Sequence, residues 1–407
     1  MSTQAAPSIL FTHTHPQEGF RLLELSPELE ELLTSKDAPI LELKSPSQAL
    51  TQAVPDPSAQ DYVNLCTPTQ TYRIRQVQSS NSLHILRPSY AEISHADIKV
   101  IAEDDVDPLS LPSEALSAIA KCSSTLELHV PAGGFSAVPF LEKSLRLYDP
   151  RPEDGGMDVA MAESDSGMRL DAMRVREIRE RLWGDIPVSG KLCAEGWMEI
   201  CAFVDLDSDL DSDSGEGEVG CCWRPSARAR MGVWKRVVEG SVLQGIDLEK
   251  QFLVQDLWKA VIDEGDEGGV EVPFPRALLE AVVRRVCVVE ERVELGDEIK
   301  WASFDRKECT QWVGETYLAA TAPTSSSAIG RSEFLRGWKD CLPESWRGEA
   351  ALSKLTSGCY SSHDPTTIFF VEPAQRQQAS KTNSSASAAA AKAKNTRNWH
   401  ELLKGRP

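Results

Sequence analysis

Alternating polar and apolar positions mark the first third of the chain. Between Thr69 and Gln76, threonine and arginine alternate with glutamine, tyrosine and isoleucine. This period of two, in a run rich in β-branched and aromatic residues, predicts a half-buried strand. The run Ser79–Ser82 then supplies turn-forming residues, so we expect a turn there and a second strand at Leu83–Leu86.

The apolar residues of this stretch do not all fall on the same face of a regular strand. Tyr72 and Ile74 share one face of a regular strand, and Val77 falls on the opposite face. Either the strand is covered on both faces, or a bulge near Arg75–Gln76 shifts the register. Both outcomes suit a sheet that another chain helps to cover.

Short strands are expected across most of the first 150 residues, and helices are few there. Ser26 followed by Pro27 predicts the start of one helix, because serine caps helices and proline fits their first turn. Strands without covering helices leave exposed sheet edges. A barrel closed by strands of a partner chain would remove those edges. The other expected strands are Phe20–Leu25, Ile40–Lys44, Tyr62–Cys66 and Thr125–Val130.

Helical spacing of apolar residues replaces the alternation after Arg169. Near the end of the folded part, three short helices precede a strand, which is the order of a winged-helix module. A similar order runs from Asp247 to Ser303, and the segment from Arg169 is a candidate third copy. The expected elements are helices Arg169–Trp183, Cys193–Phe203, Asp247–Ile262, Phe274–Val286, Asp305–Ala319, one capped by Ser332, and Ser345–Leu355, with strands at KWASF and Thr366–Val371.

These patterns predict an α+β chain with an N-terminal β-rich, barrel-forming domain followed by tandem winged-helix domains. The predicted parts are a flexible lead (1–18), a β-rich partner-binding domain (19–148), a linker (149–168), a first winged-helix-like region (169–246) with an acidic insert (205–218), a second winged helix (247–303), a third (304–372) and a disordered tail with a short C-terminal motif (373–407).

Several segments resemble one known family. CTPTQTYRIRQVQSSNSL, which begins at Cys66, resembles the N-terminal hallmark of the "defective in sister chromatid cohesion" family. These proteins are subunits of an alternative replication factor C clamp loader. Weaker similarity lies in Phe20–Leu33, Ile40–Pro46, Asp185–Phe203 and Ser332–Glu344.

The resemblance implies a protein that binds partner subunits and does not itself catalyse a reaction. It implies a joint barrel with two chromosome-transmission-fidelity subunits of the loader, one the large ATPase and one a small subunit. It also implies tandem winged helices that contact DNA and DNA polymerase epsilon, an indirect link to the sliding clamp, and a nuclear location. The acidic insert and the alanine-rich tail depart from the family pattern.

Charge and composition restrict the possible partners. The chain has 43 basic and 62 acidic residues, a net charge of −19, so contact with DNA requires a local basic patch. Apolar runs are too short for a membrane span. The ten cysteines form no CxxC pair, which argues against a zinc cluster and favours reduced thiols.

Motifs for catalysis or cofactors are weak or absent. No GxxxxGK[ST] loop occurs, and the GxGxxG match at Gly215–Gly220 follows acidic residues instead of a strand. Asp207–Glu218 has calcium-loop spacing, but Ser212 stands where the loop needs glycine. We therefore expect no enzyme activity and no cofactor. A stand-alone winged-helix regulator that binds nucleic acid remains the alternative.

Three sets of residues are candidates for binding, and they are given at the end of this paragraph. Two further arginine clusters, around Arg176 and around Arg230, are not among them, because such clusters are equally typical of solvated helix faces. The partner-binding candidates are Thr69, Thr71, Tyr72, Ile74, Arg75, Gln76, Val77, Ser80 and Asn81; those for nucleic acid or polymerase are Arg331, Arg336, Lys339, Arg347 and Lys354; and those of a docking motif in the tail are Trp399, Leu402 and Leu403.

Overall fold

The chain divides into two compact units of mixed α and β structure. Met1–Pro46, Pro55–Phe135 and Pro187–Ser189 belong to the first unit, and Ser47–Val54, Ser136–Ile186 and Gly190–Pro407 belong to the second. The computed structural model describes residues 10–46, 62–89, 115–149, 157–158, 165–206, 222–264, 270–272, 274–288, 295, 299–372 and 376.

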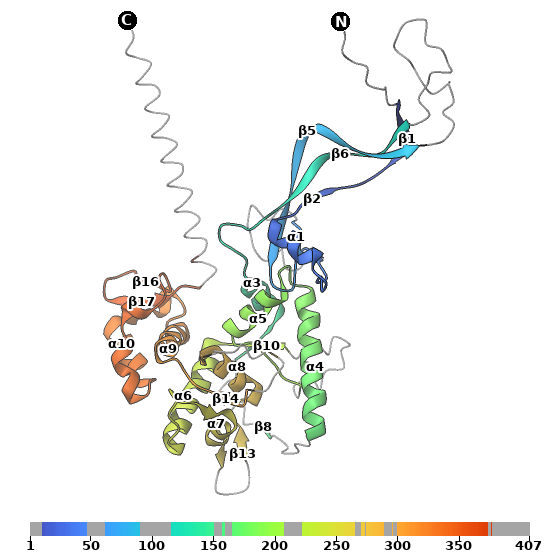
Figure 1. Cartoon of the computed structure of the whole chain (residues 1–407). Helices are drawn as coiled ribbons and strands as arrows, with labels where there is room; N and C mark the ends of the chain where they lie inside the picture. Colours follow the sequence, from blue (N-terminus) through green and yellow to red (C-terminus); the bar gives the residue numbers. More distant parts are fainter. Residues whose placement is uncertain are drawn as a thin grey trace, which may run out of the picture. The chain divides into compact units, whose positions relative to one another are not determined.

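A six-stranded sheet organises the first unit. Its order is β1-β6-β5-β4-β3, and β2 also pairs with β6. The longest strands, β5 and β6, form an antiparallel ribbon (Figure 1). Over the described residues the sheet runs from β1 to β3 without closing into a barrel. The elements are β1 (Leu10–Glu18), β2 (Leu22–Glu24), α1 (Pro27–Thr34), β3 (Glu42–Lys44), β4 (Asn64–Cys66), β5 (Thr71–Ser89) and β6 (Ala115–His129).

β5 is one strand where two strands and a turn were predicted. Its register with β6 is regular up to Gln78 and resumes at Leu83, and over this interval β5 advances by five residues and β6 by two. Ser79–Ser82 therefore forms a bulge, so the predicted turn is wrong. The bulge also lies later than Arg75–Gln76, where it was expected. Small polar residues favour turns and bulges alike, and the long pairing with β6 selects the bulge.

Two other features of the first unit concern its N-terminal part. Residues 10–18, predicted to be flexible, form β1, which pairs in parallel with β6. That partner lies a hundred residues away in sequence, so no local pattern indicates the pairing. The predicted cap of α1 is confirmed, since Ser26 accepts a hydrogen bond from the Leu29 N–H at 3.4 Å. Leu29 packs with Leu65 and Tyr72 in a small core.

The second unit repeats one order of elements three times: a helix, a strand, a second helix, a third segment and two strands. We call the third segment, which follows the second helix and is itself helical in the first two repeats, the third-position segment. In the first repeat (138–225), β10 lies between β7 and β9, parallel to β7 and antiparallel to β9. The predicted linker contains β8 and the start of α4. The elements are α3 (Val138–Ser144), β7 (Arg146–Tyr148), β8 (Met157–Asp158), α4 (Asp165–Gly184), α5 (Gly190–Glu199), β9 (Phe203–Val204) and β10 (Cys222–Pro225).

The second repeat (227–304) has the same order with an added hairpin. β14 pairs with β11, and Cys287 forms a bridge with Phe304 on the strand that continues from β14. The hairpin β12–β13 is inserted between α7 and α8, and β13 pairs with β8. The elements are α6 (Ala227–Gln244), β11 (Phe252–Leu253), α7 (Val254–Val261), β12 (Asp263–Glu264), β13 (Val270–Val272), α8 (Arg276–Val286) and β14 (Trp301–Ala302).

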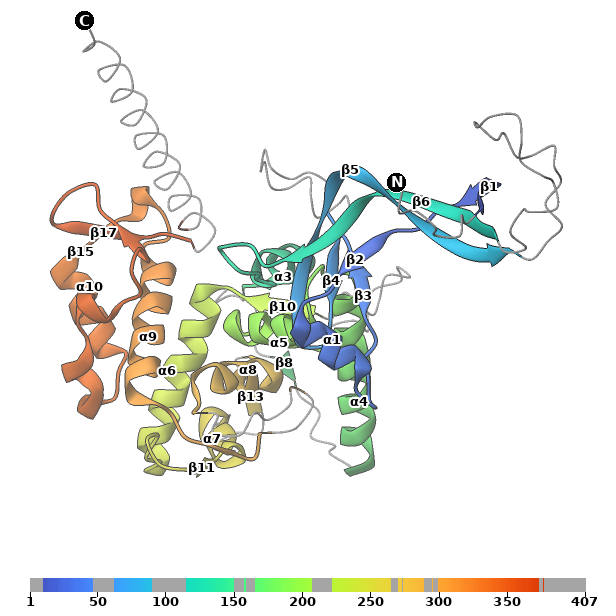
Figure 2. The same cartoon turned by 45° about the horizontal axis from the view of Figure 1, so that its top comes forward.

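The third repeat (306–370) contains a three-stranded antiparallel sheet in the order β15-β17-β16. Figure 2 shows β15 and β17 with α9 and α10, coloured orange to red. Its third-position segment is not an α-helix but two short 3₁₀ turns. The elements are α9 (Arg306–Thr321), β15 (Ile329–Gly330), α10 (Arg331–Asp340), β16 (Tyr360–Ser361) and β17 (Thr367–Phe370), with 3₁₀ turns at Ser325–Ser327, Glu344–Glu349 and Leu352–Lys354.

Sequence periodicity located most helices of the second unit but not their boundaries. Helix α9 and strand β17 are confirmed, and Asp305 caps α9. The helix expected at Ser345–Leu355 is wrong, because 3₁₀ turns replace it. The expected cap at Ser332 is also wrong, since α10 begins after Gly330. Helix α6 was missed. It packs on α7 and so belongs with the second repeat, ahead of the predicted boundary at 247.

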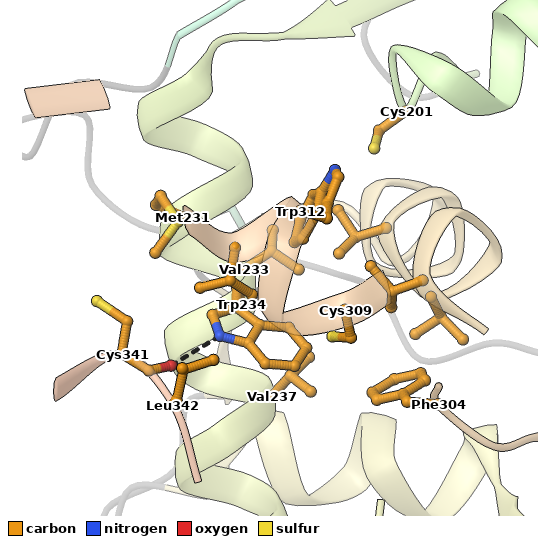
Figure 3. Close-up of a cluster of buried hydrophobic side chains, with 14 of the residues drawn as sticks. Cys201, Met231, Val233, Trp234, Val237, Phe304, Cys309, Trp312, Cys341 and Leu342 are labelled. Atoms are coloured by element: carbon orange, nitrogen blue, oxygen red, sulfur yellow. Dashed lines mark hydrogen bonds between the residues drawn. The ribbon is translucent and has the colours of Figure 1, made fainter. Parts of the chain in front are cut away.

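A single hydrophobic core joins the second and third repeats and reaches the end of the first. Trp234 of α6 is fully buried, and its ring contacts the ring of Trp312 at a centroid distance of 6.2 Å (Figure 3). It also contacts the ring of Trp346 at 6.3 Å. The Trp234 indole N–H donates to the Cys341 carbonyl at 2.8 Å. The Trp346 N–H donates in turn to Glu249 at 2.6 Å. Side chains of different repeats therefore complete one another's cores.

Close packing of α9 on α10 requires glycine at two positions. A Cβ atom on Gly314 would lie 2.5 Å from the ring of Trp338, and one on Gly337 would meet Tyr317. We expect Gly314→Ala to lower the free energy of unfolding by about 1–3 kcal/mol, because the buried ring must shift.

Gly232→Ala on α6 is the matched control. A Cβ there has no neighbour within 4 Å, so removing backbone freedom should stabilise the helix by about 0.5–1 kcal/mol. Urea unfolding of both variants measures the difference. Equal shifts in the two midpoints would show that the α9–α10 contact does not restrict position 314.

Candidate partner-binding surface

The hallmark segment begins with a hairpin turn between β4 and β5. The Thr67 hydroxyl accepts hydrogen bonds from the N–H groups of Thr69 and Gln70 at 3.2 and 2.8 Å. The Thr67 N–H donates to the Gln70 carbonyl at 2.9 Å. Pro68 lies between these partners and has no N–H to satisfy. The motif CTPTQ is thus a turn held by one threonine.

The strands on either side of this turn hold a distant segment of the same chain. The buried Asn64 side chain donates to the Pro187 carbonyl at 2.6 Å. Thr71 Oγ1, also buried, accepts from the Ser189 N–H at 2.8 Å. Burial raises the pKa of the Cys66 thiol between them, and a hydrogen bond with Thr71 opposes that shift. Thr71 is therefore an internal structural residue.

The predicted partner-binding residues fall into an internal group and an outer group. Thr71 and Tyr72 are buried and Ile74 is half-buried. Arg75 forms a 2.6 Å ion pair with Glu127 of β6, and the Gln76 amide donates to Ser124 at 2.9 Å. The remaining predicted residues are exposed: Thr69, Val77, Ser80 and Asn81.

The outer edge of β5, residues 75–89, is the most distinctive surface of the first unit. β4 pairs only with Thr71–Arg73, so beyond them no described strand pairs with this edge. Four large apolar side chains on it are 36–49% exposed. A sheet edge that no described strand joins, with exposed apolar side chains beside it, is the kind of surface to which a further strand can add. These apolar residues are Val77, Leu83, Ile85 and Leu86.

Sequence reasoning also missed a half-buried cation–aromatic contact. The Arg73 guanidinium lies 3.9 Å from the centre of the Tyr62 ring. Burial raises the pKa of the Tyr62 phenol, and the positive charge of Arg73 opposes the rise. Arg73 lies in the alternating run Thr69–Gln76, and an arginine within a predicted half-buried strand was the sequence signal that could have indicated this contact. The contact fixes the start of β5 beside the hairpin turn.

Comparison with protein families gives one match. The family model for "Sister chromatid cohesion protein Dcc1" covers residues 20–378. The chain belongs to this family. No curated protein matches it. Membership in the Dcc1 family implies a role in sister chromatid cohesion and confirms the resemblance read from the hallmark motif. That motif now has a structural role as well, because it builds the turn and holds Pro187–Ser189.

The third repeat of this Dcc1 family member carries the predicted nucleic-acid or polymerase contacts. Arg336, Lys339, Arg347 and Lys354 are exposed, and Arg331 is half-buried. The same elements also expose acidic side chains, so the surface is mixed in sign rather than a continuous basic face. These acidic residues are Glu333, Asp340 and Glu344.

The third-position helices of the other two repeats face inward. Every residue of α8 is buried or half-buried, and the exposed residues of α5 are both acidic, Glu195 and Glu199. A helix that reads a DNA groove must present base-contacting side chains to solvent. Neither α5 nor α8 can do so in this structure, because each packs inside the second unit.

Of the two other arginine clusters, the one on α4 is largely occupied by contacts within the protein. Arg179 is 6% exposed and donates to the Leu295 carbonyl at 2.5 Å. Arg176 pairs with Glu180 at 2.7 Å. Most of the acidic insert (207–218) and the docking candidates Trp399, Leu402 and Leu403 lie outside the described residues. Within the described ranges, no helix has the length and apolar character needed to cross a bilayer.

The buried hydrogen bond of Thr71 yields a stability prediction. Thr71→Val preserves shape but leaves the Ser189 N–H without its acceptor, so we expect a loss of about 1–3 kcal/mol in unfolding free energy. Thr69→Val, on an exposed neighbour in the same motif, should change it by less than about 0.5 kcal/mol. Chemical denaturation of both variants tests this, and equal stability would remove the structural role assigned to Thr71.

Proposed function

We propose that this chain is a non-catalytic subunit of an alternative replication factor C clamp loader that acts in sister chromatid cohesion and DNA replication in the nucleus. It joins the chromosome-transmission-fidelity subunits through its first unit. Its second unit connects the loader to DNA polymerase epsilon and DNA, and so supports loading of the sliding clamp. Joining such modules raises their local concentration without new chemistry.

The observation that carries this proposal is the outer edge of β5. β1 and β2 pair with the other side of β6, so over the described residues β5 forms the open edge of this part of the sheet. β5 presents apolar side chains on both sides of a bulge, along an edge that no described strand joins beyond Arg73. Strands from a partner would close this sheet toward a barrel and bury those side chains. Family membership supports the same partners.

We also interpret the three repeats as winged helices. Helix, strand, helix, third segment and two strands is the winged-helix order, and the last strand lies between the other two in all three. Two departures are present. β7 is parallel to β10, whereas the corresponding pairs of the other repeats are antiparallel. The third repeat has 3₁₀ turns in place of the third helix.

The alternative, a regulator that binds nucleic acid on its own, has less support. Burial of α5 and α8 leaves the last repeat as the candidate DNA contact in the described part of the second unit. Its mixed charge, in a chain of net charge −19, favours backbone contacts of moderate strength over groove reading. Protein contacts therefore dominate the proposed role.

Charge on the β5 edge tests the assembly. Leu83→Lys combined with Ile85→Lys should weaken binding of the co-expressed clamp-loader subunits by about 100-fold or more, because two apolar side chains lose their burial. Leu243→Lys, on a residue that is 80% exposed on α6, should bind as the wild type does. Size-exclusion chromatography and calorimetry of the complexes measure the effect. Undiminished affinity of the double variant would exclude this edge as the contact.

Charge removal in the third repeat tests the DNA contact. Arg347→Gln combined with Lys354→Gln should weaken duplex binding and lower the salt slope by about 0.9 for each lost phosphate contact. Lys300→Gln combined with Lys307→Gln removes the same charge from exposed positions outside the proposed contact. If both pairs give the same salt dependence, net charge rather than a specific contact determines the affinity.

A further inference from the structure

Three buried N–H groups around Cys201 have no hydrogen-bond partner among the described residues. They are the Nε–H of Arg230 on α6, the Nε–H of Arg285 on α8 and the indole N–H of Trp312 on α9. Trp312 is 6% exposed, so bulk water does not satisfy its N–H. Buried donors are nearly always paired, so a group of unpaired donors calls for an explanation such as a bound ion.

Packing and electrostatics place these three donors together. α6 packs on both α8 and α9, and α8 packs on α9. Burial raises the pKa of the Cys201 thiol, and the positive charges of Arg230 and Arg285 both oppose the rise. Figure 3 shows the indole nitrogen of Trp312 on the side of the ring that is turned toward Cys201. The donors therefore converge on one region beside the end of α5.

Cys201 holds an uncommon backbone conformation beside these donors. Its φ of 56° lies in the left-handed region, where a glycine usually ends a helix. The Ala202 N–H donates to the Trp197 carbonyl at 2.9 Å and so ends α5 in this conformation. Outliers of this kind concentrate at functional sites, which agrees with a role for the residues around the thiol.

Positive charge is in excess around Cys201. Burial lowers the pKa of the Arg230 guanidinium, and the neighbouring charge of Arg285 lowers it further. Arg224 of β10 adds another buried Nε–H that has no partner among the described residues. Glu142 of α3, a carboxylate that interacts with both Arg224 and Arg230, is exposed. An anion that accepts hydrogen bonds from the arginines would offset this unbalanced charge.

We propose that Arg230, Arg285 and Trp312 form a binding site for a small anion that carries a phosphate group. Guanidinium groups match the geometry of phosphate oxygens, and these oxygens can accept from all three donors at once. A water molecule has two lone pairs, so it can accept from only two of the donors and does not offset the charge. Both arginines are half-buried, so the site reaches solvent on their side. The site goes beyond the proposed function and does not depend on it.

Thermal unfolding of the full chain in inorganic phosphate tests the site. Phosphate should raise the melting temperature by about 2–4 °C relative to potassium chloride of equal ionic strength, because it binds the folded chain alone. Titration calorimetry should show saturable binding of inorganic phosphate, and the same titration with pyrophosphate distinguishes a free phosphate from a phosphorylated ligand. Equal effects of phosphate and chloride would indicate general charge screening and would overturn the proposal.

Trp312→Phe and Trp338→Phe form a matched pair of variants. The fully buried Trp338 donates its indole N–H to the Thr310 carbonyl at 3.0 Å, so Trp338→Phe should lower the melting temperature but keep the full phosphate shift. Trp312→Phe removes a donor that has no partner among the described residues, and it should weaken phosphate binding by about 10-fold. A full phosphate shift in Trp312→Phe would overturn the site.

Arg230→Gln and Arg236→Gln test the charge at two positions of the same helix. Arg230→Gln should weaken phosphate binding by about 10-fold or more, because it removes a charged donor. Arg236 is exposed, and Arg236→Gln should bind phosphate as the wild type does. Equal weakening by both variants would mean that net charge determines binding, and the proposal would fail. If Arg230→Gln does not fold, the phosphate shift of Trp312→Phe decides the question.

Discussion

The shared core around Trp234 is the constraint on which the second unit depends. Its indole ring packs between side chains of the second and third repeats, and its N–H group satisfies a carbonyl beyond α10. A buried indole without that acceptor would carry an unsatisfied donor. Neither repeat can separate from the other without exposing this core, so the repeats form a continuous body instead of linked independent modules.

That continuity restricts which surfaces of the second unit are exposed to solvent. The third-position helices α5 and α8 carry the inward surfaces through which the second unit packs, and such helices cannot also enter a groove. In the described part of the second unit, the third repeat is the one whose third-position segment exposes basic side chains, and this segment consists of 3₁₀ turns. Acidic side chains are exposed beside them, so the surface there is mixed in charge.

Local signals in the sequence predicted local structure well and pairing poorly. The Ser26 and Pro27 cap, the strand beginning at the hallmark motif and α9 with its Asp305 cap all follow from nearby residues. The bulge at Ser79–Ser82, β1 and the place of α6 depend on partners far along the chain. At the candidate surface the motif was found, but alternation could not show that Thr71 faces Pro187–Ser189 while Val77 faces outward.

The bulge in β5 has a consequence for how this surface can vary. The register between β5 and β6 is regular from Arg73 to Gln78, skips residues 79–82, resumes at Leu83 and shifts once more between Ile85 and Leu86. A residue added or removed within 79–82 would change the size of this bulge and leave the register of Arg73–Gln78 with β6 in place. The faces of Tyr72, Ile74 and Val77 are therefore independent of the exact length of the serine-rich stretch.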